Sequence, residues 1–457
     1  MRFTKFGKAL AIGALSLGVL YGVTSCDESY TVGFLYVTGT VTASSGNNGI
    51  ISGFKIDHNT GHLTTINGTP VATGGSNPVR AVLTLSSRFV YVLNRGTNSA
   101  GNGNCTPADP CLNANITQFA VGGNGVLTYQ ETFYTQGINP FRLLADGSGS
   151  YLLALDQQAP DMTNCARALG TLGTGSPVTS CGDVTVFQIN QTTGRLSLIR
   201  NIQVTDASNN PLTYFPVPAN PVDFAISGGY LLTLTGGPTP SSYPYTGGTE
   251  VWPYTYVSTS GQLQLSLNGI QQLSIGQGTA IVNTNGVIYI LDNEPVTIGS
   301  GSSFNAGVYP GQVLPFSLTS GGALQAEPGG VIPDDATLAN PIQVLLESKT
   351  KYLYVANQGN NTTGNNPESG IAGYFITTAP SFQLSFIPEE PFGSGSGPQC
   401  IVEDPSDQFV YEANMYSSNV TGRAVDPNSG NLNDLRTNAS YSLDGPATWC
   451  FIDGRTD

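Results

Sequence analysis

The chain has 457 residues and contains 57 Gly and 29 Pro, but only 10% of its residues are charged. This composition disfavours a helical fold, because amphipathic helices need charged faces and tolerate little Gly or Pro, and it favours short strands joined by turns. The formal net charge of −14, with no basic cluster to offset it, excludes nucleic acid as a partner, since binding a phosphate backbone requires clustered Lys and Arg.

An export signal is indicated at the N-terminus. Arg2, Lys5 and Lys8 form a basic start, and the run Ala9–Val23 that follows is apolar. This run is too short and too rich in Gly for a comfortable membrane span, but it suits the apolar core of a signal peptide. We therefore predict that the segment directs export and is then removed.

The residues Val-Thr-Ser stand directly before Cys26. Small residues before a cysteine resemble a bacterial lipobox, in which the thiol is acylated and becomes the new N-terminus. We predict a lipoprotein-type signal peptide over residues 1–25, lipidation of Cys26, a short tether over residues 26–32 and one domain over residues 33–457. Ordinary cleavage after Ser25 is the alternative.

A turn recurs along the rest of the chain. The stretch Lys55–Leu63 (KIDHNTGHL) is the first of seven, and each lies between two runs of alternating apolar and polar residues, as a hairpin turn does. Gly supplies the positive φ angle of such a turn, and Asn, Asp, Ser and Thr bond back to its backbone. The other six turns are Ala120–Leu127, Ile189–Leu196, Val257–Leu263, Ser317–Leu324, Ile376–Leu384 and Val425–Leu432.

The first turn holds both histidines of the chain, His58 and His62, beside Asp57. Two imidazoles and a carboxylate at this spacing raise the question of a metal site or an acid/base pair. None of the other six turns has a histidine. We therefore interpret both histidines as variable residues of a turn, and we predict neither a metal nor a cofactor.

Two further elements recur in phase with the turns, a strand that begins with Pro or Gly (A) and an aromatic strand (B). Together with the two strands of each hairpin (C and D), they make seven repeats of four antiparallel strands. Units of this kind, arranged radially so that their edges are protected, form an all-β, seven-bladed β-propeller. The A strands begin near residues 77, 139, 220, 276, 340, 397 and 445, and the B strands begin near residues 34, 89, 151, 230, 287, 352 and 409.

The ends of the domain differ in phase, because its first strand is a B strand and its last is an A strand. We predict a three-plus-one closure in which the C-terminal strand completes the N-terminal blade. Setting Cys26 aside leaves six cysteines, and no pair has the CxxC spacing of a zinc site. We predict three disulfides, as in exported proteins, with the third across the seam of the ring: Cys105–Cys111, Cys165–Cys181 and Cys400–Cys450.

One face of the propeller should carry the long loops. The A–B and C–D turns are short, whereas insertions collect in the B–C and D–A loops, which share the other face, and such a face usually binds the ligand. The A strands also begin there. In each A strand, we take the residue two positions after the leading Pro, or the residue aligned with that position. These residues are predicted to form a ring at the channel mouth: Arg80, Arg142, Asp223, Thr279, Gln343, Cys400 and Thr448.

Arg80 and Arg142 stand out in this ring because the chain has so few basic residues. With Asp223 in the next blade, they are candidates for binding a carboxylate or a phosphate through bidentate hydrogen bonds. Gln343 is a further candidate. The alternative is that the charged residues pair with each other and close the channel without a ligand.

The pattern over Phe54–Pro70, F-x-I-D-x-x-T-G-x-L-T-x-I-x-G-T-P, with the aromatic strands such as FVYVLN, resembles the lactonase family of seven-bladed β-propellers. That family includes enzymes that hydrolyse 6-phosphogluconolactone and relatives that act on muconolactone. The resemblance implies a site at the channel mouth with His, Arg and Glu. Only Arg80 and Arg142 fit this pattern here, and Gln358 stands where the resemblance implies Glu.

These observations favour a binding or interaction scaffold of the bacterial cell envelope, exported and attached to the membrane through a lipid anchor. Its expected partner is a small anionic or carbohydrate ligand, or an envelope protein. The alternative is a hydrolase that opens a lactone or sugar lactone at the channel mouth. The sequence offers no convincing base for that reaction, so catalysis stays open.

Overall fold

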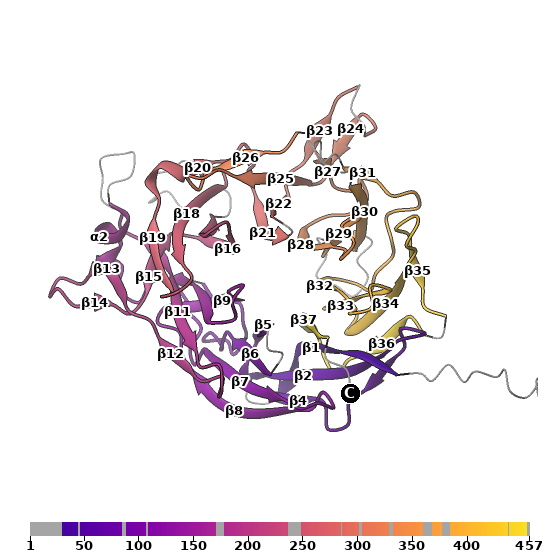
Figure 1. The fold of residues 1–457 in the computed structure, drawn as a ribbon, viewed down its shortest axis with the longest axis horizontal. Coiled ribbons are helices and arrows are strands. Elements are labelled where there is room, and N and C mark those ends of the chain that lie inside the picture. Colours follow the sequence, from indigo (N-terminus) through magenta and orange to yellow (C-terminus); the bar gives the residue numbers. More distant parts are fainter. Residues whose placement is uncertain are drawn as a thin grey trace, which may run out of the picture.

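The computed structural model describes residues 30–43, 46–84, 88–106, 108–170, 178–235, 248–284, 286–300, 304–328, 332–359, 368–376, 384–436 and 438–454. Within these ranges, seven antiparallel sheets stand around a central axis as the blades of a propeller (Figure 1). Each blade contains the predicted A, B, C and D strands in order from the axis outward. The predicted fold is therefore confirmed.

Each blade begins with its A strand at the axis and ends with its D strand at the outer edge. In that order, blade 1 contains β37 (Ala447–Asp453), β1 (Thr31–Ala43), β2 (Gly46–Asp57) and β3 (Leu63–Thr65); blade 2, β5 (Pro78–Leu83), β6 (Phe89–Asn94), β7 (Asn115–Val121) and β8 (Leu127–Phe133); blade 3, β9 (Ile138–Ala145), β10 (Tyr151–Gln158), β11 (Cys181–Ile189) and β12 (Leu196–Leu198); blade 4, β16 (Pro221–Ser227), β17 (Tyr230–Thr235), β18 (Glu250–Val257) and β19 (Gln262–Leu265). Blade 5 contains β21 (Gly278–Thr284), β22 (Val287–Asp292), β25 (Gln312–Leu318) and β26 (Leu324–Ala326); blade 6, β28 (Pro341–Leu346), β29 (Tyr352–Asn357), β30 (Gly370–Ile376) and β31 (Leu384–Phe386); blade 7, β32 (Pro398–Glu403), β33 (Phe409–Asn414), β34 (Asn419–Val425) and β35 (Leu432–Asp434).

Short elements extend this framework. In the part of the chain that the structure describes, five further strands pair with the C strands of their blades, and two small hairpins and three short helices lie in the connections. The extra strands are β4 (Val71–Ser76), β15 (Phe215–Pro218), β20 (Gln271–Gln272), β27 (Ile332–Pro333) and β36 (Ser440–Ser442); the hairpins are β13 (Asn201–Thr205) with β14 (Pro211–Leu212) and β23 (Val296–Ile298) with β24 (Gly307–Tyr309); the helices are η1 (Met162–Asn164), α2 (Cys165–Leu169) and η2 (Leu267–Gly269).

The ring closes as predicted. The C-terminal strand β37 pairs with β1 from Phe34 opposite Asp453 to Gly39 opposite Ala447, so the last strand of the chain completes the first blade. The predicted disulfide Cys400–Cys450 joins β32 of blade 7 to β37 across the same seam. The other two predicted disulfides, Cys105–Cys111 and Cys165–Cys181, are also present.

Adjacent blades share apolar cores, because successive residues of a B strand point to opposite sides of the blade. In β6, Val90 and Val92 pack with Phe34 and Tyr36 of blade 1. Tyr91 and Leu93 of the same strand pack with Leu152 and Ala154 of blade 3. Every blade is thus buried on both faces.

The repeated turns also fasten the blades to each other. A tyrosine of the B strand donates its hydroxyl hydrogen to the carbonyl of the turn glycine in the next blade. Tyr411 bonds Gly61 at 2.7 Å in this way across the seam of the ring, and Gly61 has the positive φ of 66° that such a turn needs. The same bond joins Tyr36 to Gly125, Tyr91 to Gly194 and Tyr354 to Gly430.

The turn with both histidines therefore belongs to the ring closure. Nδ1 of His62 lies 3.0 Å from the Tyr441 hydroxyl, and the His58 ring stacks on Tyr30 at a centroid distance of 4.5 Å. Nowhere in the described ranges do three or more His, Cys, Asp or Glu residues group as metal ligands would.

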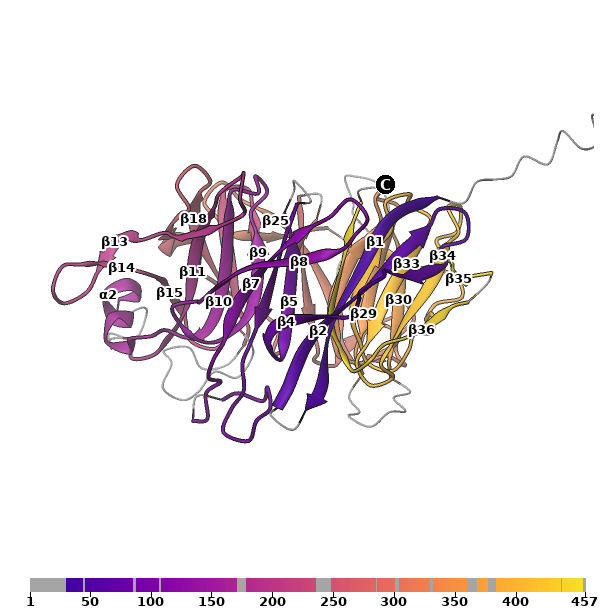
Figure 2. The same ribbon diagram turned by 90° about the horizontal axis from the view of Figure 1, so that it is seen from below.

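The long connections lie where the sequence predicts them. The β1–β2 hairpin and the loop between β6 and β7 extend past the blades at one end of the channel, on the lower side of Figure 2. Parts of the B–C and D–A loops, among them residues 171–177, 236–247 and 360–367, lie outside the described ranges, as do the predicted signal peptide and Cys26. No helix in the described part of the chain has the length and apolar character of a membrane span.

Candidate binding site in the axial channel

The seven A strands bring one residue each to the same level of the channel. Each strand has a register shift near its start, where one extra residue bulges between two paired ones. The first paired residue after the bulge is equivalent in all blades, and we call this set the axial ring: Arg80, Arg142, Asp223, Ala280, Gln343, Cys400 and Trp449.

Two members of the predicted ring are wrong by one residue. In blade 5 the shift falls between Gly278 and Ala280, so Ala280 takes the place predicted for Thr279. In blade 1, Trp449 pairs with Thr38 and takes the place predicted for Thr448. These two strands begin with a different pattern of Gly and Pro from the other A strands. The position of the bulge is determined by the pairing with strand B and not by the distance from the leading Pro.

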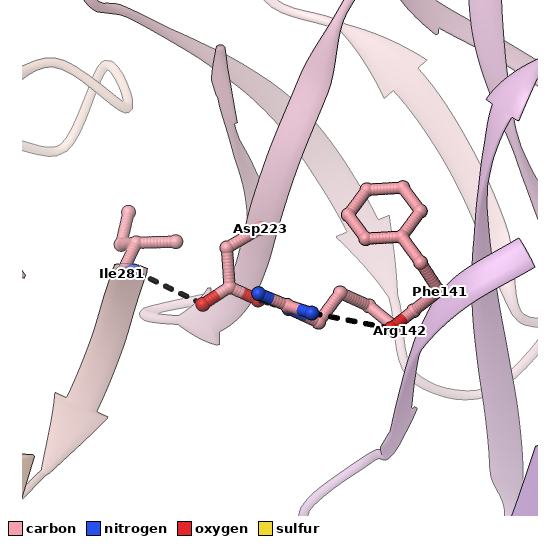
Figure 3. A network of polar contacts seen from close by, with 4 residues as sticks. All are labelled: Phe141, Arg142, Asp223 and Ile281. Carbon is pink, nitrogen blue, oxygen red and sulfur yellow. Dashed lines mark hydrogen bonds and ion pairs between the residues drawn. The ribbon is translucent and has the colours of Figure 1, made fainter. Parts of the chain in front are cut away.

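Arg142 and Asp223 form an ion pair between blades 3 and 4 (Figure 3). Nε of Arg142 donates to Oδ1 of Asp223 at 3.1 Å, and one terminal nitrogen donates to the carbonyl of Phe141 at 3.3 Å. Oδ2 of Asp223 accepts a hydrogen bond of 3.1 Å from the backbone N–H of Ile281 in blade 5. The carboxylate therefore links three consecutive blades.

Neutral residues make comparable links in the following blades. Oε1 of Gln343 accepts from the backbone N–H of Ile401 in blade 7 at 3.0 Å, and the Thr279 hydroxyl donates to the carbonyl of Pro341 in blade 6 at 2.5 Å. Within blade 1, the hydroxyls of Thr448 and Thr38 lie 2.9 Å apart. Gln343, Thr279 and Thr448 therefore have a structural role.

Arg80 differs from the rest of the ring. Its guanidinium carbon lies 3.5 Å from the centre of the Trp449 ring, and within the described residues it has neither a hydrogen bond nor an ion pair. Water reaches part of the side chain in the channel, yet burial lowers the pKa of Arg80 to about 9, with the charge of Arg142 acting in the same direction and Asp223 opposing it. Arg80 is still a cation at neutral pH, with free donors.

A cavity of about 380 Å³ begins at this ring and runs along the axis. Arg80, Arg142, Asp223, Gln343 and Trp449 form its inner end. The lining then continues along the A strands to residues 145, 147 and 283, where the A–B turns begin. The cavity thus leads to the face opposite the long loops, whereas the sequence predicted a ligand on the insertion-rich face.

Gln358 lies away from this cavity. It follows β29 at the insertion-rich end, where its Oε1 accepts a hydrogen bond of 2.7 Å from Nδ2 of Asn340. Arg95, which follows β6 at the same end, donates to Oε1 of Gln157 at 2.9 Å. Burial, together with the nearby charge of Arg142, lowers the pKa of Arg95 below its usual value. The structure therefore joins Arg80, Arg142, Asp223 and Gln343, but not Gln358.

Two residues near the axis were not predicted from the sequence. Trp449 stands beside Arg80 only because the ring closes and because the bulge shifts the strand by one residue. Arg95 was not predicted because only the A strands were searched for site residues. A basic residue directly after strand B, in so acidic a chain, is a signal that could have identified it.

The sequence comparison agrees with this architecture. A profile of the family described as "Lactonase, 7-bladed beta-propeller" matches residues 48–173 and 316–448, more than half of the chain. The chain belongs to this family. No curated protein sequence matches it closely enough to assign a relative.

Solved structures show the same fold. The periplasmic gluconolactonase of Pseudomonas aeruginosa is 17% identical, with a TM-score of 0.61 over 92% of this chain and 99% of that one. A candidate 6-phosphogluconolactonase of Bacteroides uniformis is 15% identical, with a TM-score of 0.59 over 92% and 99%. A candidate 6-phosphogluconolactonase of Bacteroides fragilis is 14% identical, with a TM-score of 0.60 over 94% and 99%.

Proposed function

We propose that this protein is an exported, lipid-anchored propeller of the bacterial cell envelope that binds a small ligand in its axial cavity. Arg80 is the main contact, and the ligand presents an anionic group or a lactone carbonyl to it. The cavity volume of about 380 Å³ is at the lower end of the range for small-molecule sites, which supports a small ligand.

The observation that carries this proposal is the unpaired guanidinium of Arg80. A partly buried cation without a counter-ion lowers the stability of the fold, so its retention at the end of a cavity is best explained by a ligand. Trp449 covers one face of the guanidinium and leaves the N–H groups at its edge free to donate. Charge-assisted hydrogen bonds from such an edge fit a carboxylate, a phosphate or a carbonyl oxygen.

Hydrolysis of a lactone is the second candidate, favoured by membership of the lactonase family. Arg80 is suited to stabilise the oxyanion that forms when water attacks the carbonyl. The reaction also needs a base, and Asp223 is the one carboxylate among the described lining residues. Both of its oxygens are already bonded to neighbouring blades. Binding is therefore the better-supported function.

Ligand binding is tested by titrating sugar acids, sugar lactones and alkyl carboxylates into the purified protein. Arg80→Gln should weaken binding by about ten- to a hundredfold, because one charge-assisted contact contributes roughly 1.5–3 kcal/mol. Arg195→Gln is the matched control, since Arg195 is exposed and pairs with Glu131 far from the axis. Equal affinities in wild type and Arg80→Gln would refute the proposed contact.

The same panel of lactones separates binding from hydrolysis. If the protein is a hydrolase, ring opening releases an acid, which a pH-stat measures, and both Arg80→Gln and Asp223→Asn should depress the rate. If the lactones bind but no acid is released, the binding function is supported and hydrolysis of the lactones in that panel is excluded.

The lipid anchor is supported by the Val-Thr-Ser-Cys stretch and by three disulfides, which are typical of proteins outside the cytoplasm. Cys26→Ala should move the protein from the detergent-extracted membrane fraction to the soluble fraction. An unchanged distribution would contradict the anchor.

A further inference from the structure

We infer that the ligand of the axial cavity is amphiphilic, with a carboxylate or lactone head at Arg80 and an apolar tail directed toward the face of the A–B turns. This inference rests on the proposed function and adds the class of the ligand and its direction of access. It follows from the unequal polarity of the two parts of the cavity.

Apart from Arg80 and Trp449, each polar side chain of the described lining has at least one partner. Asp223 and Gln343 are bonded to backbone N–H groups of neighbouring strands. Nδ2 of Asn283, near the open end, donates to the carbonyl of Ile226 at 2.8 Å. A ligand with hydroxyl groups along its whole length, such as an unsubstituted sugar acid, would find few free polar side chains beyond the inner end.

The remaining wall is apolar. Between the axial ring and the A–B turns, the cavity is lined by Val82, Leu144, Ile226 and Val282 from four consecutive blades. A hydrocarbon tail that leaves water for this wall gains free energy with each methylene group. A cation at the inner end and apolar walls toward the A–B turns thus favour a head-first orientation of the ligand.

The inner edges of the A strands moderate this gain. Among the described residues, no strand pairs with β5, β9, β16 or β21 on the side of the axis, so some backbone N–H and C=O groups also face the channel. A tail displaces water from these groups without replacing its hydrogen bonds. We therefore expect each added methylene group to tighten binding by about two- to fourfold, with the upper limit set by full burial.

A chain-length series tests the inference directly. Isothermal titration of straight-chain carboxylates from acetate to octanoate should give affinities that rise with length until the tail leaves the cavity. A parallel series of γ-lactones with alkyl substituents distinguishes an acidic head from a lactone head. Arg80→Gln should weaken every member of the series that binds by a similar factor, because it removes the head contact only.

Val82→Thr and Val282→Thr keep the shape of the wall and add one hydroxyl group each. The pair should lower the affinity for octanoate by about threefold or more and leave that for acetate unchanged. Both variants retain a β-branched side chain suited to a strand, so the propeller should fold.

A matched pair of variants tests the direction from which the ligand enters the cavity. A side chain added at Gly147, on the rim of the cavity, meets no atom within 4 Å, and the same is true of Gly299 in the insertion between β23 and β24. Gly147→Trp should slow the association of octanoate by at least several-fold in stopped-flow measurements, whereas Gly299→Trp should not.

The outcomes separate this inference from the function on which it rests. If acetate and octanoate bind equally well and Arg80→Gln weakens both, the proposed site stands and the amphiphilic ligand is refuted. If no carboxylate or lactone binds to the wild type, the proposed function itself fails. If affinity rises with chain length but only Gly299→Trp slows association, the cavity binds an apolar tail and the proposed direction of access is wrong.

Discussion

Apart from Trp449 of blade 1, the axial ring divides into two arcs that share one backbone arrangement and differ in charge. Blades 2–4 carry Arg80, Arg142 and Asp223 (the charged arc), and blades 5–7 carry Ala280, Gln343 and Cys400 (the neutral arc). Both arcs bond side chain to backbone across the blade boundary, through Asp223 in one and through Gln343 in the other.

This comparison shows that charge is not needed to hold neighbouring blades together at the axis. The neutral amide of Gln343 makes the same kind of bond as the carboxylate of Asp223, at 3.0 and 3.1 Å. Partly buried charges cost free energy of desolvation, and a structural ring would be more stable without them. The charged arc therefore needs a further reason, which the proposed ligand provides.

The largest expected effect concerns the end of the neutral arc, where a disulfide replaces the hydrogen bond between blades. Cys400 and Cys450 enclose 50 residues, and opening such a loop should cost about 4 kcal/mol of unfolding free energy in the chain-entropy account. The variant Cys400→Ala/Cys450→Ala should show this loss in chemical denaturation.

The small loop between Cys105 and Cys111 supplies the control, because its separation of 6 residues predicts a loss of only about 2 kcal/mol for Cys105→Ala/Cys111→Ala. Equal losses in the two variants would show that the seam is not the point where the ring depends on a covalent link.

The next effect is a pH dependence that arises beside the neutral arc. Glu412 of β33 is fully buried, and burial raises its pKa to about 8, partly opposed by the charge of Arg423. Since the folded-state pKa exceeds that of the unfolded chain, the folded protein holds the proton more tightly. The resulting stability is fully present below the unfolded pKa of about 4 and is lost as pH rises through about 8.

Raising the pH from 6 to 8 should therefore cost about 2 kcal/mol from this group alone. Asp334, whose pKa burial raises to about 7, should act in the same direction. Denaturation at both pH values measures the loss, and Glu412→Gln should make it smaller. A wild type that is equally stable at pH 6 and 8 would show that Glu412 is ionised in the fold.

A smaller effect tests the ion pair of the charged arc. Asp223→Asn keeps an oxygen that can accept from Ile281 but removes the charge that faces Arg142. Because the Arg142 and Asp223 side chains are 25% and 11% exposed, solvent screens the pair, and we expect a loss of about 1–2 kcal/mol. Anion affinity should rise, since Arg80 and Arg142 then lack a competing carboxylate. Thr279→Val, in blade 5 beside the neutral arc and not among the residues that line the cavity, should leave anion affinity unchanged.

The sequence was sufficient for the fold because the fold depends on local signals. The turn Gly61, the tyrosines of the B strands and the Pro-led A strands repeat along the chain, and their phase alone predicted the closure by β37. The disulfide Cys400–Cys450 followed from that phase.

The candidate site was harder to predict from the sequence, because it depends on a bulge of one residue and on contacts between distant strands. The count from Pro predicted Thr448, whereas the pairing with Thr38 brings Trp449 into the ring. The stack of Arg80 on Trp449 joins residues that are 369 positions apart in the chain, and no local pattern predicts it. The direction in which the cavity opens likewise depends on which side chains meet at the axis.

The smallest expected effect has the opposite sign and bears most directly on function. Arg80→Met replaces an unpaired, partly buried cation by an apolar side chain of similar length that can still pack on Trp449. If the cation is retained only for a ligand, its removal should stabilise the free protein by about 1 kcal/mol and weaken ligand binding by about ten- to a hundredfold. Thermal unfolding with and without octanoate measures both effects: at one octanoate concentration, the ligand should raise the Tm of the variant by less than that of the wild type. Arg142→Met is the matched control, because it strands Asp223 without its partner and should destabilise the fold. A loss of stability in Arg80→Met as large as that in Arg142→Met would mean that Arg80 belongs to the framework of the ring, and the charged arc would then need no ligand to explain it.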